Sequence, residues 1–363
     1  MGISNLSRKR SPLTTVQSFS TMQPRLCFVG SMLGKHAGYP PDYAETLAHL
    51  FTQTGYSVKL VSCAPYRLLR LADIVSSLIA WRNQTDVFLI NVHSGKAFGL
   101  ADAASLTAKW LHKPVVLMLH GGNLPDFSRR YPQWTRRVFS RAAAITAPSR
   151  YLAERVPLPQ TAHIIPNVIP IENYPFRSRR RLQPRLMWMR TFEAAYHPLM
   201  AVETLRLLLK SFPHAHLTMA GQDQGLLEQV QKQIVKDHLE KHIRLAGYLN
   251  NEKKLQAFSQ HDIFLNTNRI DNMPVSLIEA AACGLPIVAA NVGGIPFLVQ
   301  HEATALLVES GDVCGMANAV RRLLSEPELA ERLSQNGRRL AESFTWKRVQ
   351  AQWEELFAQL LQR

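Results

Sequence analysis

The sequence predicts an α/β protein with two domains, each a parallel β-sheet covered by helices on both faces, facing each other across a cleft. Three observations lead to this prediction. Short runs rich in valine, isoleucine and leucine alternate with helical patterns, as in strands joined through helices. A proline- and arginine-rich break at residues 169–185 interrupts the alternation, which then restarts. The length of 363 residues also favours more than one domain.

The first domain, which we place at residues 23–170, holds six strand candidates. Helical patterns lie between them, for example at residues 42–55 and 97–113. The strand candidates are RLCFVG (25–30), YSVKLVS (56–62), DVFLINV (86–92), PVVLMLHGG (114–122), AAITAPS (143–149) and AHIIPNV (162–168).

Residues 171–184 form the predicted linker, and we expect most of the arginines in this stretch to be solvated. The second domain follows at residues 185–343, and an amphipathic helix at 344–363 ends the chain. Ligands of open parallel sheets bind beyond the carboxyl ends of the strands, so the cleft is the expected site. The second set of strand candidates is RLMWMR (185–190), AHLTMAG (215–221), HIRLAGYL (242–249), DIFLNTN (262–268), PIVAAN (286–291) and ALLV (305–308).

The first 22 residues lack periodicity and carry no apolar segment of the kind that a secretory signal needs. We expect a disordered tail, with Met22 as a second candidate for the native start. The four cysteines, Cys27, Cys63, Cys283 and Cys314, form no C-x-x-C pair. We therefore expect buried thiols in a reducing compartment.

The chain is strongly basic, with 42 Lys and Arg against 27 Asp and Glu and a net charge of +15. This charge favours anionic partners, such as nucleotides, sugar phosphates, nucleic acid or an acidic membrane surface. A basic surface without a specific partner explains it equally well. The basic amphipathic stretch at 65–83 leaves a similar choice between a core-facing helix, which we favour, and a membrane-facing one.

The stretch DNMPVSLIEAAACGLPIVAANVGGIP (271–296) predicts a short apolar helix with a weakly capped start. Pro274 is favoured at the first helical position, which makes Met273 the cap residue, and a thioether caps poorly. Asn272 would be the cap if the helix began one residue earlier. Gly284 ends the helix after Cys283. The free N–H groups and the dipole at such a start favour an anion.

Glu279 is the acidic residue within this helix. Helical side chains lean toward the N-terminus, so its carboxylate is directed toward whatever the helix start binds. Two acceptor oxygens suit the vicinal hydroxyls of a ribose, and a phosphate at the helix start would complete a nucleotide. Alternatively, Asp271, Ser276 and Glu279 form a narrow solvent-exposed stripe.

The same stretch resembles the donor-site signature of family 4 glycosyltransferases, which have the GT-B fold, and the resemblance extends from about residue 24 to the end of the chain. The resemblance implies a retaining enzyme that takes a sugar from a nucleotide-sugar. It further implies that Glu279 holds the ribose, that Asp271 contacts the donor sugar, and that the backbone near the helix start binds the pyrophosphate. The donor-binding set is Arg190, His197, Asp271, Asn272, Met273, Pro274, Val275 and Glu279.

Three further segments fit the resemblance. GSMLGKHAGYPP (30–41) is similar to the family's glycine-rich loop, with Gly30, Gly34 and Gly38 close to acceptor or phosphate. LMLHGGN (117–123) places His120 where the family has a histidine near the reacting sugar, although a lone histidine is more often structural. FTW (344–346), before the last helix, is similar to the start of the family's crossover helix, which implies that the helix at 344–363 packs back on the first domain. Apart from the resemblance, Lys96, which follows a strand, is a candidate acceptor contact.

The chain departs from the family where the pyrophosphate is held. Arg190 occupies the expected position and is assigned a catalytic role with His120 and Asp271. The lysine expected five residues later is replaced by Ala195. His197 nearby could partly substitute, although we favour a capping or buried role for it. No Asp-x-Asp pair occurs, so we expect neither a metal nor another cofactor.

We therefore expect a cytoplasmic hexosyltransferase of cell-envelope glycan biosynthesis, peripheral on the inner membrane face. It would use a UDP- or GDP-sugar and a glycan, lipid-linked glycan or small-molecule acceptor. A nucleotide-sugar epimerase on the same fold is the first alternative. A nucleic-acid-binding protein is the second, but the basic residues are scattered and no recognised module is present, so no nucleic acid is expected.

Overall fold

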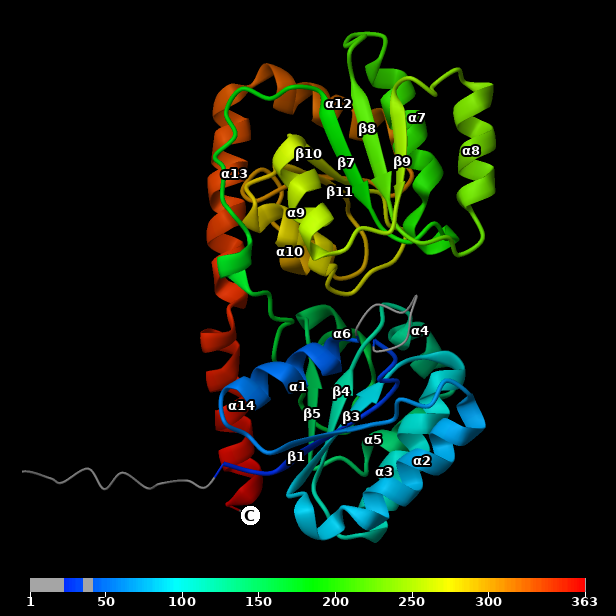
Figure 1. Cartoon of the computed structure of the whole chain (residues 1–363), viewed down its shortest axis with the longest axis vertical. Helices are drawn as coiled ribbons and strands as arrows, with labels where there is room; N and C mark the ends of the chain where they lie inside the picture. The colour runs from blue at the N-terminus through cyan, green and yellow to red at the C-terminus, as the bar shows by residue number, and fades with distance from the viewer. Residues whose placement is uncertain (1–22, 35–41, 363) are drawn as a thin grey trace, which may run out of the picture.

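The computed structural model describes residues 23–34 and 42–362, and it folds them into two α/β lobes (Figure 1). Each lobe contains a six-stranded sheet in which all strand pairs are parallel. The predicted α/β class and the twelve predicted strands are therefore confirmed. The predictions for residues 1–22 and for Gly38 lie outside the described residues.

The first sheet has the strand order β2-β1-β3-β4-β5-β6. Its central strands are buried on both faces, which explains why they read as continuous apolar runs. The strands are β1 (Leu26–Val29), β2 (Val58–Val61), β3 (Val87–Val92), β4 (Val115–Leu119), β5 (Ala144–Ala147) and β6 (His163–Ile164). The helices are α1 (Tyr43–Gln53), α2 (Arg67–Ala80), α3 (Phe98–Trp110), α4 (Leu124–Arg130), α5 (Pro132–Phe139) and α6 (Arg150–Arg155), with 3-10 turns η1 (Arg82–Gln84) and η2 (Gly95–Ala97).

The second sheet has the order β12-β11-β10-β7-β8-β9. Its strands are β7 (Arg185–Met189), β8 (His216–Ala220), β9 (Ile243–Gly247), β10 (Ile263–Asn266), β11 (Ile287–Ala290) and β12 (Leu306–Val308). The helices are α7 (Pro198–Leu208), α8 (Leu227–Lys236), α9 (Asn251–Gln260), α10 (Val275–Ala282), α11 (Ile295–Leu298), α12 (Val313–Ser325) and α13 (Pro327–Ala341), with turns η3 (Ile171–Asn173), η4 (Ala194–Tyr196) and η5 (Glu342–Phe344).

The last helix, α14 (Trp346–Leu361), crosses from the second lobe to the first (Figure 1). Its apolar side packs into the core of the first lobe, where the ring centroids of Trp353 and Phe357 lie 6.2 and 5.8 Å from that of Phe51. The predicted return of the C-terminal helix to the first domain is therefore confirmed.

Both sheets contain a point at which consecutive connections leave in opposite directions. In the second sheet this point lies between β7 and β10, because β7 leads outward to β8 and β10 leads outward to β11. In the first sheet it lies between β1 and β3. Ligands of doubly wound sheets bind at such switch points, outside the carboxyl ends of the strands.

Two expectations about individual residues need correction. Arg179 is buried rather than solvated, because its guanidinium donates to the carbonyl oxygens of Phe258, at 2.7 Å, and His261, at 3.1 Å; burial lowers its pKa to about 10. Cys63 and Cys314 are exposed, whereas the other two cysteines are buried. No disulfide links any of the four, all of which lie within the described ranges.

The basic stretch at 65–83 forms α2, which is core-facing on one side only. Ile74 and Leu78 are buried, but Tyr66, Leu68 and Leu69 are 72%, 82% and 60% exposed. Nowhere in residues 23–34 and 42–362 is there a helix with the length and apolar character needed to span a membrane.

Candidate active site

The site is built around the loop that joins β10 to α10. The helix begins at Val275, one residue later than predicted, and Pro274 rather than Met273 occupies the cap position. Among the described residues no side chain accepts a hydrogen bond from the N–H groups at this start. The predicted weakly capped helix start is therefore confirmed, and free N–H groups at such a start favour an anion.

Three glycines allow the backbone of this loop to pass between other segments. A Cβ atom on Gly293 or Gly294 would overlap the carbonyl oxygens of Asp271 and Asn272, respectively. On the first lobe, a Cβ on Gly122 would lie only 3.1 Å from the carbonyl carbon of Asp271. The HGG segment after β4 therefore contacts the loop after β10, and the strand ends of the two lobes meet here.

Arg190 follows β7 and forms an ion pair with the carboxylate of Asp271. Asp271 also accepts hydrogen bonds from the side-chain amide of Asn268, at 2.7 Å, and from the backbone N–H of Asn272, at 2.7 Å. The Arg190 guanidinium lies 4.3 Å from the centre of the Tyr196 ring. Burial lowers the pKa of Arg190, but an arginine stays charged at neutral pH.

Glu279 is buried, with 8% of its surface exposed, as is Ser276 at 7%, so the alternative of a solvent-exposed stripe is wrong. The Tyr174 hydroxyl donates to Oε1 of Glu279 at 2.7 Å, and Nζ of Lys254 donates to the same oxygen at 2.5 Å. In the described part of the chain no hydrogen bond is recorded to Oε2. This oxygen can therefore accept from a ligand while Oε1 is held by the protein.

A second cationic group lies next to the position of the missing lysine. The backbone N–H of Arg269 donates to the carbonyl of Ala195 at 2.8 Å, and its guanidinium lies 3.1 Å from Nε2 of His197. Burial and the charge of Arg269 both lower the pKa of His197. A neutral His197 therefore accepts at Nε2 and carries its proton on Nδ1.

His197 lies at the start of α7 with a left-handed φ of 47°, and its side chain forms no cap hydrogen bond there. The predicted capping role is therefore not seen. Thr267 fixes the same turn by donating to the carbonyl of Tyr196 at 2.7 Å.

On the first lobe, His120 follows β4 and stacks on His93, with ring centroids 5.4 Å apart. Asp42 Oδ2 lies 3.8 Å from Nε2 of His93. Burial, and then the neighbouring His93, lower the pKa of His120 to about 4, although Asp42 opposes this shift. His120 is therefore neutral at pH 7.

Unpartnered polar atoms gather at this junction. Among the described residues twelve buried side-chain nitrogen or oxygen atoms have no hydrogen-bond partner. Six of them lie at the ends of β4, β7 and β10 or at the starts of α7 and α10. They are His120 Nε2, Arg190 Nε, His197 Nδ1, Asn266 Nδ2, Asn268 Oδ1 and Ser276 Oγ. Buried polar groups without partners are rare in native proteins, so this concentration indicates a polar ligand.

The remaining candidates lie farther along the first lobe. The backbone N–H of Gly30 donates to Val61 at 2.7 Å, and a Cβ there would approach Asn91 at 3.1 Å, so Gly30 leaves room for the side chain of Asn91. The N–H of Gly34 donates to Glu45 at 3.1 Å.

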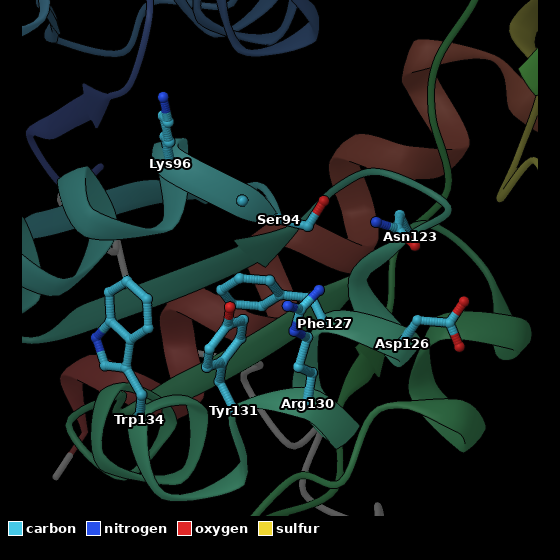
Figure 2. Close-up of a pocket in the computed structure, with 9 residues that line it drawn as sticks. Ser94, Lys96, Asn123, Asp126, Phe127, Arg130, Tyr131 and Trp134 are labelled. Atoms are coloured by element: carbon cyan, nitrogen blue, oxygen red, sulfur yellow. The ribbon is translucent and has the colours of Figure 1, made fainter. Parts of the chain in front are cut away.

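Lys96 lines a cavity of 540 Å³ beside the 3-10 turn η2. Figure 2 shows this cavity and its aromatic and basic side chains. No three His, Cys, Asp or Glu side chains gather as a metal site within the residues that the structure describes.

Sequence reasoning missed Lys254, Tyr174 and Arg269. Lys254 lies in NEKKLQAF beside Lys253, and only helix phase separates the two lysines. Tyr174 belongs to the segment that we predicted to be a linker. Arg269 lies two residues before Asp271, and that closeness was the available signal for it.

Two family models match the chain. Residues 37–173 match the model described as Glycosyltransferase Family 4, and residues 176–340 match that of Glycosyl transferases group 1. The chain belongs to glycosyltransferase family 4. The two matched ranges correspond closely to the two lobes, so the predicted family is confirmed.

Curated relatives match over part of their length. The N-acetyl-alpha-D-glucosaminyl L-malate synthase of Bacillus anthracis is 33% identical over 131 residues, which cover 36% of this family 4 chain and 34% of the relative. The amylovoran biosynthesis glycosyltransferase AmsK of Erwinia amylovora is 26% identical over 66% of this chain and 61% of its own length. The chain thus spans less than two thirds of these relatives.

Solved structures match along almost the whole chain. HepE of Anabaena in complex with UDP and glucose gives a TM-score of 0.75 at 16% identity, covering 93% of this chain and 99% of that one. Sucrose-phosphate synthase from Thermosynechococcus elongatus gives 0.76 at 17% identity, with 93% and 99% covered. At this identity the likeness shows the fold, and the predicted GT-B fold is confirmed.

Proposed function

We propose that this protein is a retaining glycosyltransferase that moves a hexose from a nucleoside diphosphate sugar to a hydroxyl of an acceptor. One observation carries the proposal: the uncapped start of α10 lies beside Arg190, at the switch point of the second sheet and among unpartnered buried polar atoms. Free N–H donors, a cation and a helix dipole together suit a diphosphate.

Each part of the nucleotide-sugar donor has a group in the site that would bind it. The helix start and Arg190 bind the diphosphate, and Oε2 of Glu279 accepts from the ribose hydroxyls. Asp271 and the neutral His120 hydrogen-bond the hexose from opposite lobes. Asp271 also positions Arg190 through their ion pair. Met273 and Asn272 contribute backbone contacts in this loop.

Arg269 supplies the second cation of the diphosphate site, because Ala195 stands where the family has a lysine. Because no ion pair is recorded for Arg269 in the described residues, its charge is available to the diphosphate. His197 orients it and offers the unpartnered Nδ1–H to a phosphate oxygen.

In the proposed reaction, the bond between the anomeric carbon and the β-phosphate oxygen breaks toward an oxocarbenium-like state. The acceptor oxygen attacks from the face that the leaving group vacates, which retains the configuration. Its proton passes to an oxygen of the leaving diphosphate, so a separate base is unnecessary. Arg190, Arg269 and the start of α10 stabilise the charge that develops on the diphosphate.

UDP is the first nucleotide to test, because the similar HepE structures are complexes with UDP or UDP-glucose. GDP is the second. A thermal-shift panel of UDP, GDP, ADP and CMP with their sugars tests the proposal, since a ligand at 100 times its Kd adds about 2.7 kcal/mol of stability. The Arg190→Ala variant serves as the control with an impaired diphosphate site. If none of these ligands stabilises the unaltered protein, the proposal is overturned.

The proposed acceptor is a glycan, a lipid-linked glycan or a small molecule. The proposed biological role of the enzyme is in cell-envelope glycan synthesis. One similar protein, AmsK, is named for amylovoran biosynthesis. The exposed Tyr66, Leu68 and Leu69 of the basic helix α2 support peripheral contact with an anionic membrane on the cytoplasmic side. Co-sedimentation with phosphatidylglycerol vesicles, weakened in Leu68→Ser, tests this location.

The epimerase alternative makes a different prediction from transfer. An epimerase would release free nucleotide from the donor with no acceptor present, whereas a transferase would release it at a comparable rate only when an acceptor is added. Measuring nucleotide release with and without acceptor separates the two reactions.

A further inference from the structure

The cavity beside Lys96 borders the proposed reaction centre on the side of the first lobe. Two of its lining segments continue directly from residues of the site. Ser94 follows His93, whose ring stacks on His120. Asn123 follows Gly122, which approaches the backbone of Asp271. The cavity therefore begins where a group attacking the donor sugar would have to lie.

Three aromatic rings form one wall of this cavity (Figure 2). The ring of Phe127 lies 5.0 Å from that of Tyr131 and 5.8 Å from that of Trp134. Trp134 is fixed because its Nε1–H donates to Asp102 at 2.6 Å. Rigid aromatic faces with a few polar groups are typical of sites for small ligands, and they suit the apolar C–H face of a sugar ring.

The charges around the cavity are predominantly positive. Lys96 and Arg130 line it, and no ion pair involves either of them among the described residues. Asp126 is the carboxylate in the lining, and it is paired with Arg129. Arg130 lies 5.6 Å from the centre of the Tyr131 ring, so a cation stands directly beside the aromatic wall.

We propose that this cavity is the acceptor subsite and that its ligand is a saccharide bearing a phosphate or carboxylate. The sugar ring stacks on Tyr131 and Trp134, and the anionic group binds Arg130 and Lys96. The volume of 540 Å³ lies within the range of about 300–1,000 Å³ for small-molecule sites. The inference rests on the proposed glycosyl transfer, and it names the class of acceptor.

The test compares neutral and anionic probes on the full chain saturated with UDP. Binding of glucose, glucose 6-phosphate, glucuronate and inorganic phosphate is measured by ligand-observed NMR. We expect the two anionic sugars to bind at least about tenfold more tightly than glucose, as one charged hydrogen bond allows. Equal affinities for glucose and glucose 6-phosphate would overturn the proposal.

Matched variants locate the binding. Arg130→Ala and Lys96→Ala should each weaken glucose 6-phosphate binding by about tenfold, whereas Arg136→Ala, an exposed arginine on α5 outside the cavity lining, should not. Tyr131→Ala should weaken glucose 6-phosphate but leave inorganic phosphate unchanged, because the sugar loses its stacking surface. The same loss in Arg136→Ala as in Arg130→Ala would assign the effect to general charge and refute the subsite.

A further arm distinguishes a free sugar phosphate from a lipid-linked one. A polyprenyl-phosphate sugar in detergent micelles is tested as acceptor beside glucose 6-phosphate, and dependence of either on Arg130 supports the subsite. UDP binding, followed by thermal shift, reports separately on the donor site. If UDP fails to bind while the anionic sugars still require Arg130, the proposed transfer is wrong, and the cavity is an anionic-sugar site without an acceptor role. If UDP binds and the probes do not discriminate, the subsite is wrong alone.

Discussion

The guanidinium of Arg190 is paired with the carboxylate of Asp271, and this contact joins the end of β7 to the loop that follows β10. The contact therefore bridges β7 and β10 at the switch point of the second sheet. A bound diphosphate would either bind Arg190 together with Asp271 or replace Asp271 as the ion-pair partner of Arg190. The pair therefore keeps the arginine oriented and charged where the leaving group is expected.

Arg190→Ala should lower turnover by about two to four orders of magnitude. Two hydrogen bonds to a charged group are worth about 3–6 kcal/mol, and about 1.4 kcal/mol corresponds to one order. Arg190→Lys should recover only part, because a point charge does not reproduce the planar fork. Steady-state kinetics with saturating donor measure both. A loss below tenfold for Arg190→Ala would mean that the phosphates are held elsewhere.

Arg269→Ala should weaken UDP binding by about 10- to 100-fold, the value of one charged hydrogen bond. Ala195→Lys should tighten UDP binding and partly rescue Arg269→Ala, because it restores a cation at the adjacent position. Isothermal titration calorimetry measures all three, with Arg244→Ala on β9 as an exposed control. Equal losses for Arg244→Ala and Arg269→Ala would indicate a nonspecific charge effect.

Glu279→Gln should reduce donor binding and also destabilise the fold, because it leaves Lys254 partly buried without its charged partner. Removing one partner of a buried pair is costly, whereas replacing both is often nearly neutral. The double variant Glu279→Gln/Lys254→Met should therefore regain most of the lost stability but none of the donor binding.

Urea unfolding and UDP titration follow the two properties of these variants separately. If the double variant regained UDP affinity along with stability, Glu279 would have a structural role only.

His120 should make stability depend on pH in a defined window. Its pKa is lowered from 6.5 to about 4 in the folded chain, so its contribution is complete above pH 6.5. Between pH 6.5 and 4 the unfolded chain takes up a proton that the folded chain does not, and stability falls by up to about 1.4 kcal/mol per pH unit. His120→Gln should flatten this dependence relative to the exposed His49→Gln control. Identical slopes for the two variants would contradict the assignment.

Transfer should survive a chelator, because the chain has no Asp-x-Asp pair and its described residues hold no cluster of metal ligands. We expect activity in EDTA within about twofold of the untreated enzyme, since the cationic groups that oppose the leaving charge are side chains. Complete loss that Mg²⁺ or Mn²⁺ restores would show that a metal is required.

The sequence predicted the strands more accurately than it predicted the site. Buried parallel strands appear as short apolar runs that local composition reveals, and each of the twelve was found. The start of α10 was misplaced by one residue, because proline is compatible with both the cap and the first turn.

Partners contributed by distant segments were not visible in the sequence. Tyr174 and Lys254 approach Glu279 from 105 and 25 residues away, and neither belongs to a local pattern. Arg179 was expected in solvent, since an arginine-rich stretch gives no sign that one member donates to backbone carbonyls in the interior. The loop after β10 and the start of α10 were predictable because Pro274, Glu279 and the two glycines at 293 and 294 lie within one short segment of the sequence.

The crossing of α14 has a consequence for the order in which the protein matures. Trp353 and Phe357, which follow the second lobe in the chain, complete the same core as Leu26 and Phe51, which precede that lobe. While the ribosome is still making the second lobe, the first lobe exposes the apolar surface that α14 will cover. The nascent first lobe therefore becomes fully stable only after α14 has been synthesised, and a ribosome that stalls shortly before residue 346 would leave an aggregation-prone chain although both sheets had been made.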